Sequence, residues 1–274
     1  MKHVLFRFLL AWLFVASVWA GQTYTFAVVP QFSPVDIGTR WTPLLKRIES
    51  DTGLAFQLRV FEKTPAFEVE FLKGIPDFIY LNPYHMVMAA RAQGYVPLAK
   101  SAESLAGILV VDRDGPVKNL SDLNGASLVF PSPNAFGASL YMRALLTEKE
   151  KLGFTPVFAG THQNVYRHVL LGEEKAGGGV LATLEREPAP VRARLHILYK
   201  TPETPSHPVA AHPRVPTEVR EKVVASLLAL QRDPAGRKLL DDVELSGVQP
   251  ADYAKDYQPL ERLRLERYLV VDKK

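Results

Sequence analysis

The order of polar and apolar residues predicts alternating strands and helices from residue 23 onward. Residues 23–29, TYTFAVV, alternate as a half-buried strand does and run into the turn PQFSP. Apolar residues at 41, 44, 45 and 48 have the spacing of one helix face. FQLRVF at 56–61 is the next predicted strand, a second helix is predicted from Thr64, as its N-cap, to Gly74, and DFIYL at 77–81 predicts a buried strand. This is a βαβαβ unit.

The same alternation returns in the second half of the chain. The predicted segments are, in order, strands at 107–111 and 126–130, a helix through 138–145, a helix capped by Thr161, strands at 176–184 and 194–200, and a helix from Thr217 with a proline-interrupted helical tail. The sequence has no low-complexity linker and no short-period repeat. The pattern predicts an α/β protein.

Two lobes that share one chain fit this pattern better than two independent domains. The C-terminal helix needs an already formed lobe to pack against. We therefore expect segments near 104–108 and 201–208 to cross between the lobes. Lobe 1 is predicted to hold residues 21–105 and 206–274, and lobe 2 residues 106–205.

Residues 1–20 have the pattern of a secretory signal peptide. Lys2 and Arg7 precede an apolar run from Phe8 to Val18 that is too short to span about 30 Å of hydrocarbon. We predict cleavage after Ala20, which places the mature protein in the periplasm. An uncleaved membrane anchor is the alternative reading.

Composition indicates an ordinary globular protein, and we expect the mature chain not to be anchored to a membrane. Of the 274 residues, 47% are apolar and 23% are charged, and there is no cysteine. Without cysteine the chain has neither a disulfide nor a lipid-modified N-terminal cysteine. After loss of Lys2 and Arg7, two of the 33 basic residues, the net charge against 29 acidic residues is about +2. That charge is too weak to predict nucleic-acid binding.

The turn between Ser132 and Ala138 is a candidate anion site. It joins the predicted strand 126–130 to a helix, where free backbone N–H groups and the positive end of the helix dipole are exposed. Gly137 allows close approach of the backbone, and Ser132, Asn134 and Ser139 can donate hydrogen bonds. The alternative is that Ser132 or Asn134 only caps the helix.

Several motifs together resemble one protein family. They are RWTPLL (40–45), DFIYLNPYHMVMA (77–89), FPSPNAFGASLYMRALL (130–146), THQNVYRHVLLG (161–172) with AGGG (176–179), and TPETPSHP (201–208). In this order they resemble the periplasmic phosphonate, phosphite and phosphate-binding proteins of ABC importers. The resemblance implies a type 2 periplasmic-binding fold, in which two α/β lobes joined by two crossing segments close on a small ligand.

The resemblance also implies where the ligand lies. Its oxyanion would meet the amides of Ala135, Phe136 and Gly137. Family members that bind phosphonates typically carry a Ser-Thr-Ser run at these positions, so three hydroxyl donors are missing here. Carboxylates, sulfonates and sulfate therefore remain as alternative ligands. We expect Gly137→Asp to abolish binding and leave the fold intact.

Further ligand-binding candidates follow from the same matching. They are Tyr80, Asn82, Tyr84, His85, Thr161, His162, Asn164, Ser206 and His207. As alternatives, the two tyrosines are core aromatics, Thr161 is a plain cap, and Ser206 and His207 fix a hinge. We expect a histidine beside an anion to be partly protonated near neutral pH.

Other functional classes have weaker support. His85, His162 and His207 lack the spacing and carboxylate partner typical of zinc sites, so no metal or cofactor is predicted. Ser139 lies in FGASLY, which lacks the second glycine of a nucleophile elbow, and AGGG lacks the Gly-Lys-Ser/Thr of a phosphate loop. We expect no catalytic residues.

The sequence thus predicts a monomeric periplasmic solute-binding protein. Its partners are a small anion, here a phosphonate or related phosphorus oxyanion such as phosphite or phosphate, and a membrane ABC permease. Two alternatives remain open: a ligand-sensing partner of a membrane receptor or sensor kinase, and a binder of a different small anion.

Overall fold

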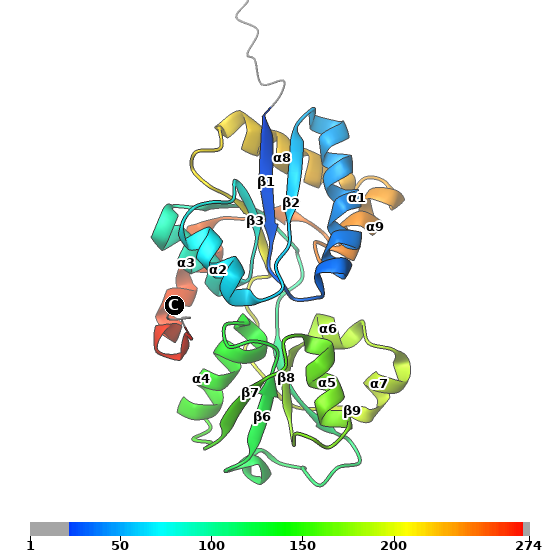
Figure 1. Ribbon diagram of the computed structural model, residues 1–274, viewed down its shortest axis with the longest axis vertical. Helices are drawn as coiled ribbons and strands as arrows, with labels where there is room; N and C mark the ends of the chain where they lie inside the picture. The colour runs from blue at the N-terminus through cyan, green and yellow to red at the C-terminus, as the bar shows by residue number, and fades with distance from the viewer. Residues whose placement is uncertain (1–21, 271–274) are drawn as a thin grey trace, which may run out of the picture.

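Two α/β lobes, each built around one sheet, make up the computed structural model, which describes residues 22–270 (Figure 1). The first sheet has the order β11-β4-β10-β3-β1-β2. Its strands are β1 (Thr23–Val28), β2 (Ala55–Arg59), β3 (Phe78–Tyr80), β4 (Val96–Lys100), β10 (Pro208–Ala211) and β11 (Gln249–Pro250). Its helices are α1 (Pro34–Thr52), α2 (Thr64–Leu72), α3 (Pro83–Gln93), α8 (Thr217–Leu230) and α9 (Pro234–Asp242), followed by the short helices η3 (Tyr253–Tyr257), η4 (Gln258–Leu263) and η5 (Leu265–Tyr268).

The second sheet has the order β7-β6-β8-β5-β9. Its strands are β5 (Gly107–Asp112), β6 (Ser127–Phe130), β7 (Thr155–Phe158), β8 (Gly177–Val180) and β9 (Leu195–Lys200). Its helices are η1 (Leu120–Leu123), η2 (Phe136–Leu140), α4 (Tyr141–Glu148), α5 (His162–Leu170), α6 (Leu181–Glu185) and α7 (Ala189–Arg194). We use the predicted limits, 21–105 with 206–274 and 106–205, as names for lobe 1 and lobe 2.

Two chain segments cross between the sheets. One runs from β4 to β5, and the other runs from β9 back to β10, which pairs antiparallel with β3 and β4 in the first sheet. The segments meet where Leu105 and Thr204 form an antiparallel bridge, with N–H to carbonyl distances of 2.8 and 3.0 Å. The lobes therefore share a two-stranded hinge.

Most predicted elements are present, and two differ in an instructive way. Helix α1 ends at Gly53, whose φ of +71° suits glycine, and Thr161 caps α5 by accepting from the Asn164 amide. Helix α2 starts at Thr64 with Lys63 as N-cap, so the predicted cap is wrong by one residue. The predicted strand 176–184 is strand only to Val180, and its second half is helix α6.

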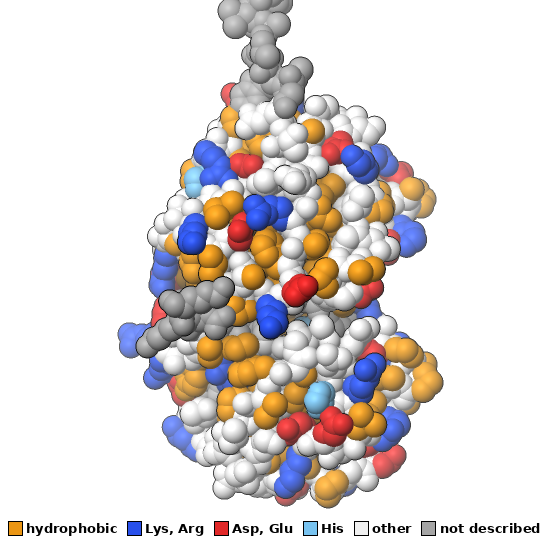
Figure 2. All heavy atoms as spheres, in the orientation of Figure 1, with side chains coloured by type: hydrophobic (Ala, Val, Ile, Leu, Met, Phe, Trp, Pro, Cys, Tyr) orange, Lys and Arg blue, Asp and Glu red, His pale blue; other side chains and the backbone are white. Residues whose placement is uncertain are grey.

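The hydrophobic core follows the sheets. A large cluster centred on lobe 1 includes Phe26, Trp41 and Phe78 and extends to Phe136 and Val180 of lobe 2, and two smaller clusters lie within lobe 2. In Figure 2 the surface is indented on the right side of the view, where the lobes meet. Within residues 22–270 no helix combines the length and apolar character needed to cross a bilayer. The predicted signal peptide lies outside the described residues.

Candidate functional site

Connections that leave the carboxyl ends of parallel strands meet between the lobes. From lobe 1 come the turn after β1 and the turn after β3. From lobe 2 come the turn Pro131–Ala135 after β6 and the turn after β7 that leads to His162. In open α/β sheets this end of the strands is where ligands bind, because helix N-termini are presented there.

The most polar feature of this region is the start of η2. Residues Phe136–Leu140 form a π-helical turn that continues into α4, and the Ala135 carbonyl accepts from the amides of Ser139 and Leu140. The amides of Phe136, Gly137 and Ala138 are the first three of the helical segment. In the part of the chain that the structure describes, none of them donates to another protein group. The Ala135 amide, which the prediction placed in the oxyanion site, instead donates to the Ser132 carbonyl at 3.4 Å. Among the described residues the unpaired N–H groups at this positive helix end are therefore those of Phe136, Gly137 and Ala138, one position later than predicted.

Glycines beneath this segment let it lie directly on the sheet. A Cβ at Gly107 of β5 would come within 2.1 Å of the Gly137 carbonyl oxygen, and one at Gly178 of β8 within 2.0 Å of the Ala138 carbonyl oxygen. A Cβ cannot lie this close to a carbonyl oxygen, so neither position accepts a side chain unless the η2 segment moves. The three glycines of the AGGG motif thus give β8 a stretch without side chains, and the η2 backbone packs against it.

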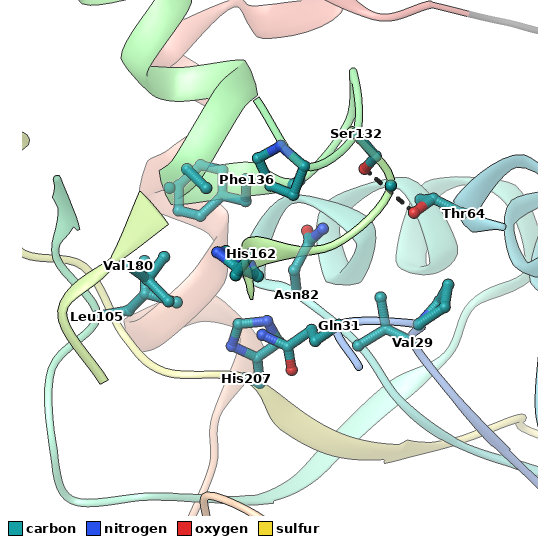
Figure 3. Close-up of a pocket in the computed structure, with 16 residues that line it drawn as sticks. Val29, Gln31, Thr64, Asn82, Leu105, Ser132, Phe136, His162, Val180 and His207 are labelled. Carbon is teal, nitrogen blue, oxygen red and sulfur yellow. Dashed lines mark hydrogen bonds between the residues drawn. The ribbon is translucent and has the colours of Figure 1, made fainter. Parts of the chain in front are cut away.

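A small cavity of about 30 Å³ lies in front of these amides (Figure 3). Its walls combine both lobes: Val29, Pro30, Gln31, Thr64, Asn82, Leu105 and His207 on one side, and Pro131, Ser132, Ala135, Phe136, Gly137, Ala138, Gly160, His162 and Val180 on the other. Among the described residues, no carboxylate and no Lys or Arg side chain lines it. The space admits only a compact group while the lobes stay closed.

Two buried imidazoles face this cavity. In Figure 3 the side chains of His162, His207 and Asn82 gather around the same space, with Phe136 above them. Burial lowers the pKa of His162 to about 4, and burial together with the neighbouring His85 and His162 rings lowers the pKa of His207 to about 3. Both rings are therefore neutral near pH 7 in the protein without ligand, and partial protonation beside a bound anion stays a prediction. A neutral imidazole still offers one N–H donor and one acceptor.

A second cavity of about 370 Å³ adjoins the first and shares Gln31, Leu105, Val180 and His207 with it. Tyr80 lines this second cavity and stacks on His207 with ring centroids 5.5 Å apart. Burial raises the pKa of the Tyr80 hydroxyl well above its usual value. Ser206 also lines this space, where its hydroxyl donates to the Ser101 carbonyl at 3.0 Å.

Polar residues of the β6 turn bond to lobe 1. Thr64 Oγ1 donates to Ser132 Oγ at 3.1 Å, a bond drawn in Figure 3. Asn82 Nδ2 donates to the Asn134 carbonyl at 3.1 Å, and Asn134 Nδ2 donates to Glu68 Oε1 at 2.9 Å. The Asn134 side chain of lobe 2 is thus hydrogen-bonded to Glu68 of lobe 1.

Two predicted ligand-binding residues lie behind the segment. Tyr84 stacks in parallel on Phe136, with centroids 6.2 Å apart, and His85 Nε2 lies 2.9 Å from Glu68 Oε1. Neither residue is part of the cavity wall. Their contacts match the core reading left open for Tyr84, and a ligand role for either stays a prediction.

Ser139 and Arg143 brace the turn from within lobe 2. The Ser139 hydroxyl donates to the Pro133 carbonyl and accepts from Arg143 Nε, both at 3.1 Å. Arg143 also donates to Pro133 at 2.7 Å. This guanidinium is 7% exposed and has no carboxylate partner within residues 22–270. It leaves uncompensated positive charge directly behind the turn.

The start of α5 is held by local hydrogen bonds. Thr161 Oγ1 accepts from the Asn164 amide at 3.2 Å, and Asn164 Nδ2 donates to the Ala159 carbonyl at 2.9 Å. These bonds fix the position of His162, the first residue of the helix. Thr161 and Asn164 support the site from outside the cavity.

Nine cavity residues were missed by sequence reasoning: Val29, Pro30, Gln31, Thr64, Leu105, Pro131, Ala138, Gly160 and Val180. Gln31 had a usable signal, because it follows a predicted strand in a turn. Leu105 and Val180 read as ordinary apolar residues, since only the meeting of the lobes brings them to the cavity. Among residues 22–270, no three His, Asp or Glu side chains gather as a metal site would require.

The family of ABC transporter phosphonate periplasmic substrate-binding proteins matches residues 26–257 of this chain. No curated protein sequence matches it. The family resemblance drawn from the motifs is confirmed.

Solved structures share the fold at low sequence identity. One is a binding-protein component of a phosphonate ABC transporter from Pseudomonas aeruginosa, with TM-score 0.79, 15% identity, and coverage of 90% of this chain and 87% of that one. Another is PhnD1 of Prochlorococcus marinus in complex with methylphosphonate, with TM-score 0.80, 15% identity, and coverage of 90% and 99%. A Xanthomonas citri protein bound to ATP has TM-score 0.74, 15% identity, and coverage of 90% and 99%. The predicted type 2 periplasmic-binding fold is confirmed.

Proposed function

Because this chain belongs to the family of periplasmic phosphonate substrate-binding proteins of ABC transporters, we propose that it binds a compact phosphorus oxyanion on the amides of Phe136, Gly137 and Ala138. The family consists of solute-binding proteins that work with a membrane permease. The proposal adds the ligand's position, a monomeric state, a signal peptide cleaved after Ala20, and a role without catalysis.

The three unpaired amides carry the proposal. Backbone N–H groups at a helix start hold oxyanions without any side-chain charge. They lie at a cavity that has no carboxylate among its described lining residues, so an anion bound there has no like charge in the cavity wall, whereas Glu103, Glu185 and Glu244 line the adjoining larger cavity. Three backbone donors also replace the hydroxyl run that the sequence lacks at 135–137.

Charge balance supports an anionic ligand. Arg143 is buried behind the turn, where it donates to the carbonyls of Pro133 and Tyr268 and has no carboxylate partner among residues 22–270. Burial lowers the pKa of this guanidinium, as expected for a cation that lacks compensation. An oxyanion on the amides would supply that compensation. Neutral His162 and His207 would then donate to its oxygens.

A ligand screen tests the ligand class. We would measure the melting temperature of residues 21–274 with phosphate, phosphite, methylphosphonate, sulfate, methanesulfonate and acetate. At about 100 times its dissociation constant, a ligand adds about 2.7 kcal/mol to the free energy of unfolding. We expect phosphorus oxyanions to raise the melting temperature and acetate to have no effect. A response to sulfate or methanesulfonate alone would contradict the phosphorus assignment.

Substitutions at Ala135 test whether these amides bind the anion. A Cβ at Gly137 would come within 2.6 Å of Leu105 Cδ2, so Gly137→Asp changes packing as well as charge. Ala135 already has its Cβ and lines the cavity. We expect Ala135→Asp to weaken oxyanion binding by about 100-fold or more, because its carboxylate would accept from the same amides and repel the anion.

Ala135→Asn is the matched neutral control. Its side chain has nearly the same shape and no charge, so we expect a loss of about tenfold or less in titration calorimetry. If Ala135→Asp and the unaltered protein bind the oxyanion with equal affinity, these amides are not part of the binding site.

A further inference from the structure

At Asn134 a buried group of hydrogen bonds joins lobe 2 to two parts of lobe 1, helix α2 and the C-terminal segment. This residue is 3% exposed and stands two positions before Phe136, the first of the three unpaired amides. Glu68 reaches it from α2 of lobe 1, and Val270 reaches it from the C-terminal segment. Figure 1 places that segment beside α3 and close to α4.

The side chain of Asn134 is fully used by these partners. One N–H of Nδ2 is shared by the two Glu68 oxygens, at 2.9 and 3.1 Å, and the other donates to the Val270 carbonyl at 2.9 Å. Its Oδ1 accepts from the Val270 amide at 3.0 Å. An aspartate or a leucine at this position would not reproduce this set of bonds.

Glu68 needs these bonds when the lobes are closed. Its side chain is 9% exposed, and its partners are His85 Nε2 and the Asn134 amide. A buried carboxylate is costly unless it accepts hydrogen bonds. If lobe 2 swings away, Asn134 leaves and water replaces it. The closed arrangement therefore contains a hydrogen-bond group that the open one lacks.

The same residue controls the direction of the anion-binding amides. The Asn134 carbonyl accepts from Asn82 Nδ2 of lobe 1 at 3.1 Å, so both its backbone and its side chain are fixed by lobe 1. The next residue, Ala135, provides the carbonyl that starts the η2 turn. A shift of Asn134 is transmitted to the amides that follow it.

We propose that Asn134 is a positioning residue that couples lobe closure to the anion site, because Glu68 and Val270 hold it in the place that directs the amides of Phe136, Gly137 and Ala138. It does not touch the anion itself. The part of this inference that concerns the anion rests on the function proposed above. The part that concerns the lobes does not.

Distance measurements between the lobes test the coupling. The chain has no cysteine, so spin labels can be attached at Val35→Cys in lobe 1 and Leu171→Cys in lobe 2, which are 78% and 65% exposed. We expect the free protein to have a closed component that methylphosphonate increases. In Asn134→Ala we expect this component to shrink with and without methylphosphonate.

Affinity and kinetics complete the test. We expect Asn134→Ala to weaken methylphosphonate binding roughly ten- to hundredfold, as loss of hydrogen bonds to a charged group does, and chiefly through faster dissociation. Glu68→Gln should act in the same direction from the other lobe, which provides a second variant if Asn134→Ala does not fold. Asn124→Ala is the control, since Asn124 Oδ1 only accepts from Gly153 within lobe 2.

Three results would overturn the coupling. They are a free protein without a closed component, equal distances and affinities in Asn134→Ala and the unaltered chain, and weaker binding in Asn134→Ala with unchanged distances. If no phosphorus oxyanion binds the unaltered protein, the proposed function fails. The distances in the free protein then still decide whether Asn134 holds the lobes together.

Discussion

At the scale of single residues, the site depends on polar groups whose behaviour burial has changed. His162 is 4% exposed, and among the described residues its Nδ1 has no hydrogen-bond partner. Buried polar atoms without partners are rare, because each costs free energy. Such an atom in the wall of a cavity is available to a ligand. Removing the ring should therefore affect stability and binding in opposite directions.

The pKa of His162 predicts how stability depends on pH. Its pKa is about 4 in the folded protein and about 6.5 in the unfolded chain. Between these values the unfolded chain binds more protons, so the free energy of unfolding falls as the pH falls. At pH 5 this histidine costs about 2 kcal/mol relative to pH 7.5.

A substitution isolates this effect. We expect His162→Gln to lose less stability than the unaltered protein between pH 7.5 and pH 5, measured by urea unfolding. His207, with a pKa near 3, destabilises the folded protein in the same pH range, so His162→Gln removes only part of the dependence. Parallel pH profiles for the two proteins would contradict the buried neutral state of His162.

At the scale of elements, strand β8 determines where the η2 segment lies. Three successive glycines leave room on both sides: Gly177 faces Val165, Gly178 faces the Ala138 carbonyl, and Gly179 faces the Tyr166 ring. The strand contributes hydrogen bonds to the sheet while the η2 turn and helix α5 pack directly on its backbone. Side chains at these three glycine positions would push η2 and α5 away from the sheet.

One added methyl group tests this packing. In Gly178→Ala the Cβ would lie 2.0 Å from the Ala138 carbonyl oxygen, so η2 must move. We expect about 1–3 kcal/mol of destabilisation and about tenfold or more weaker oxyanion binding. Gly38→Ala in helix α1 is the control, because its Cβ meets no atom within 4 Å. This change should stabilise the protein by about 0.5–1 kcal/mol and leave binding unchanged. Unchanged binding in Gly178→Ala would show that β8 does not position η2.

At the scale of the whole molecule, the lobes touch at both sides of the cleft. On one side Asn134 and Ser132 bond to lobe 1. On the other side Arg186, at the end of α6, donates to the Asp241 carbonyl of α9 at 2.7 Å. Its Nε also lies 3.8 Å from Glu244 Oε1. Carbonyls at a helix end favour a cation, so Arg186 stabilises closure.

Removal of this contact should speed ligand release. We expect Arg186→Ala to raise the dissociation rate of a bound oxyanion about two- to tenfold, because an exposed contact contributes little. Trp41 lies 4.8 Å from Tyr80 between ring centroids and is the only tryptophan after residue 20, so its fluorescence reports the cleft in stopped-flow mixing.

A neighbouring arginine provides the control for this measurement. Arg192→Ala should have no effect, since Arg192 bonds only to Glu185 and Glu187 in lobe 2. Equal release rates for Arg186→Ala and the unaltered protein would show that this side of the cleft does not control opening.

Local patterns in the sequence are enough to predict most of the elements, the family and the position of the candidate turn Ser132–Ala138. Periodic apolar residues decide which segments are helix or strand, because that choice depends on neighbours within one or two turns. The strand-to-helix connection at Ser132–Ala138 and the cap at Thr161 are equally local. These features could be predicted without knowledge of the fold.

The contacts of the polar residues, in contrast, depend on how distant segments pack together. Ser132 and Asn134 have the donors expected of ligand-binding groups, yet their partners Thr64 and Glu68 lie 68 and 66 positions away. The pKa of His162 depends on burial by distant segments, and Gly178 matters because another element packs on it. Desolvation and close packing arise where separate parts of the chain meet, and no local pattern records that meeting.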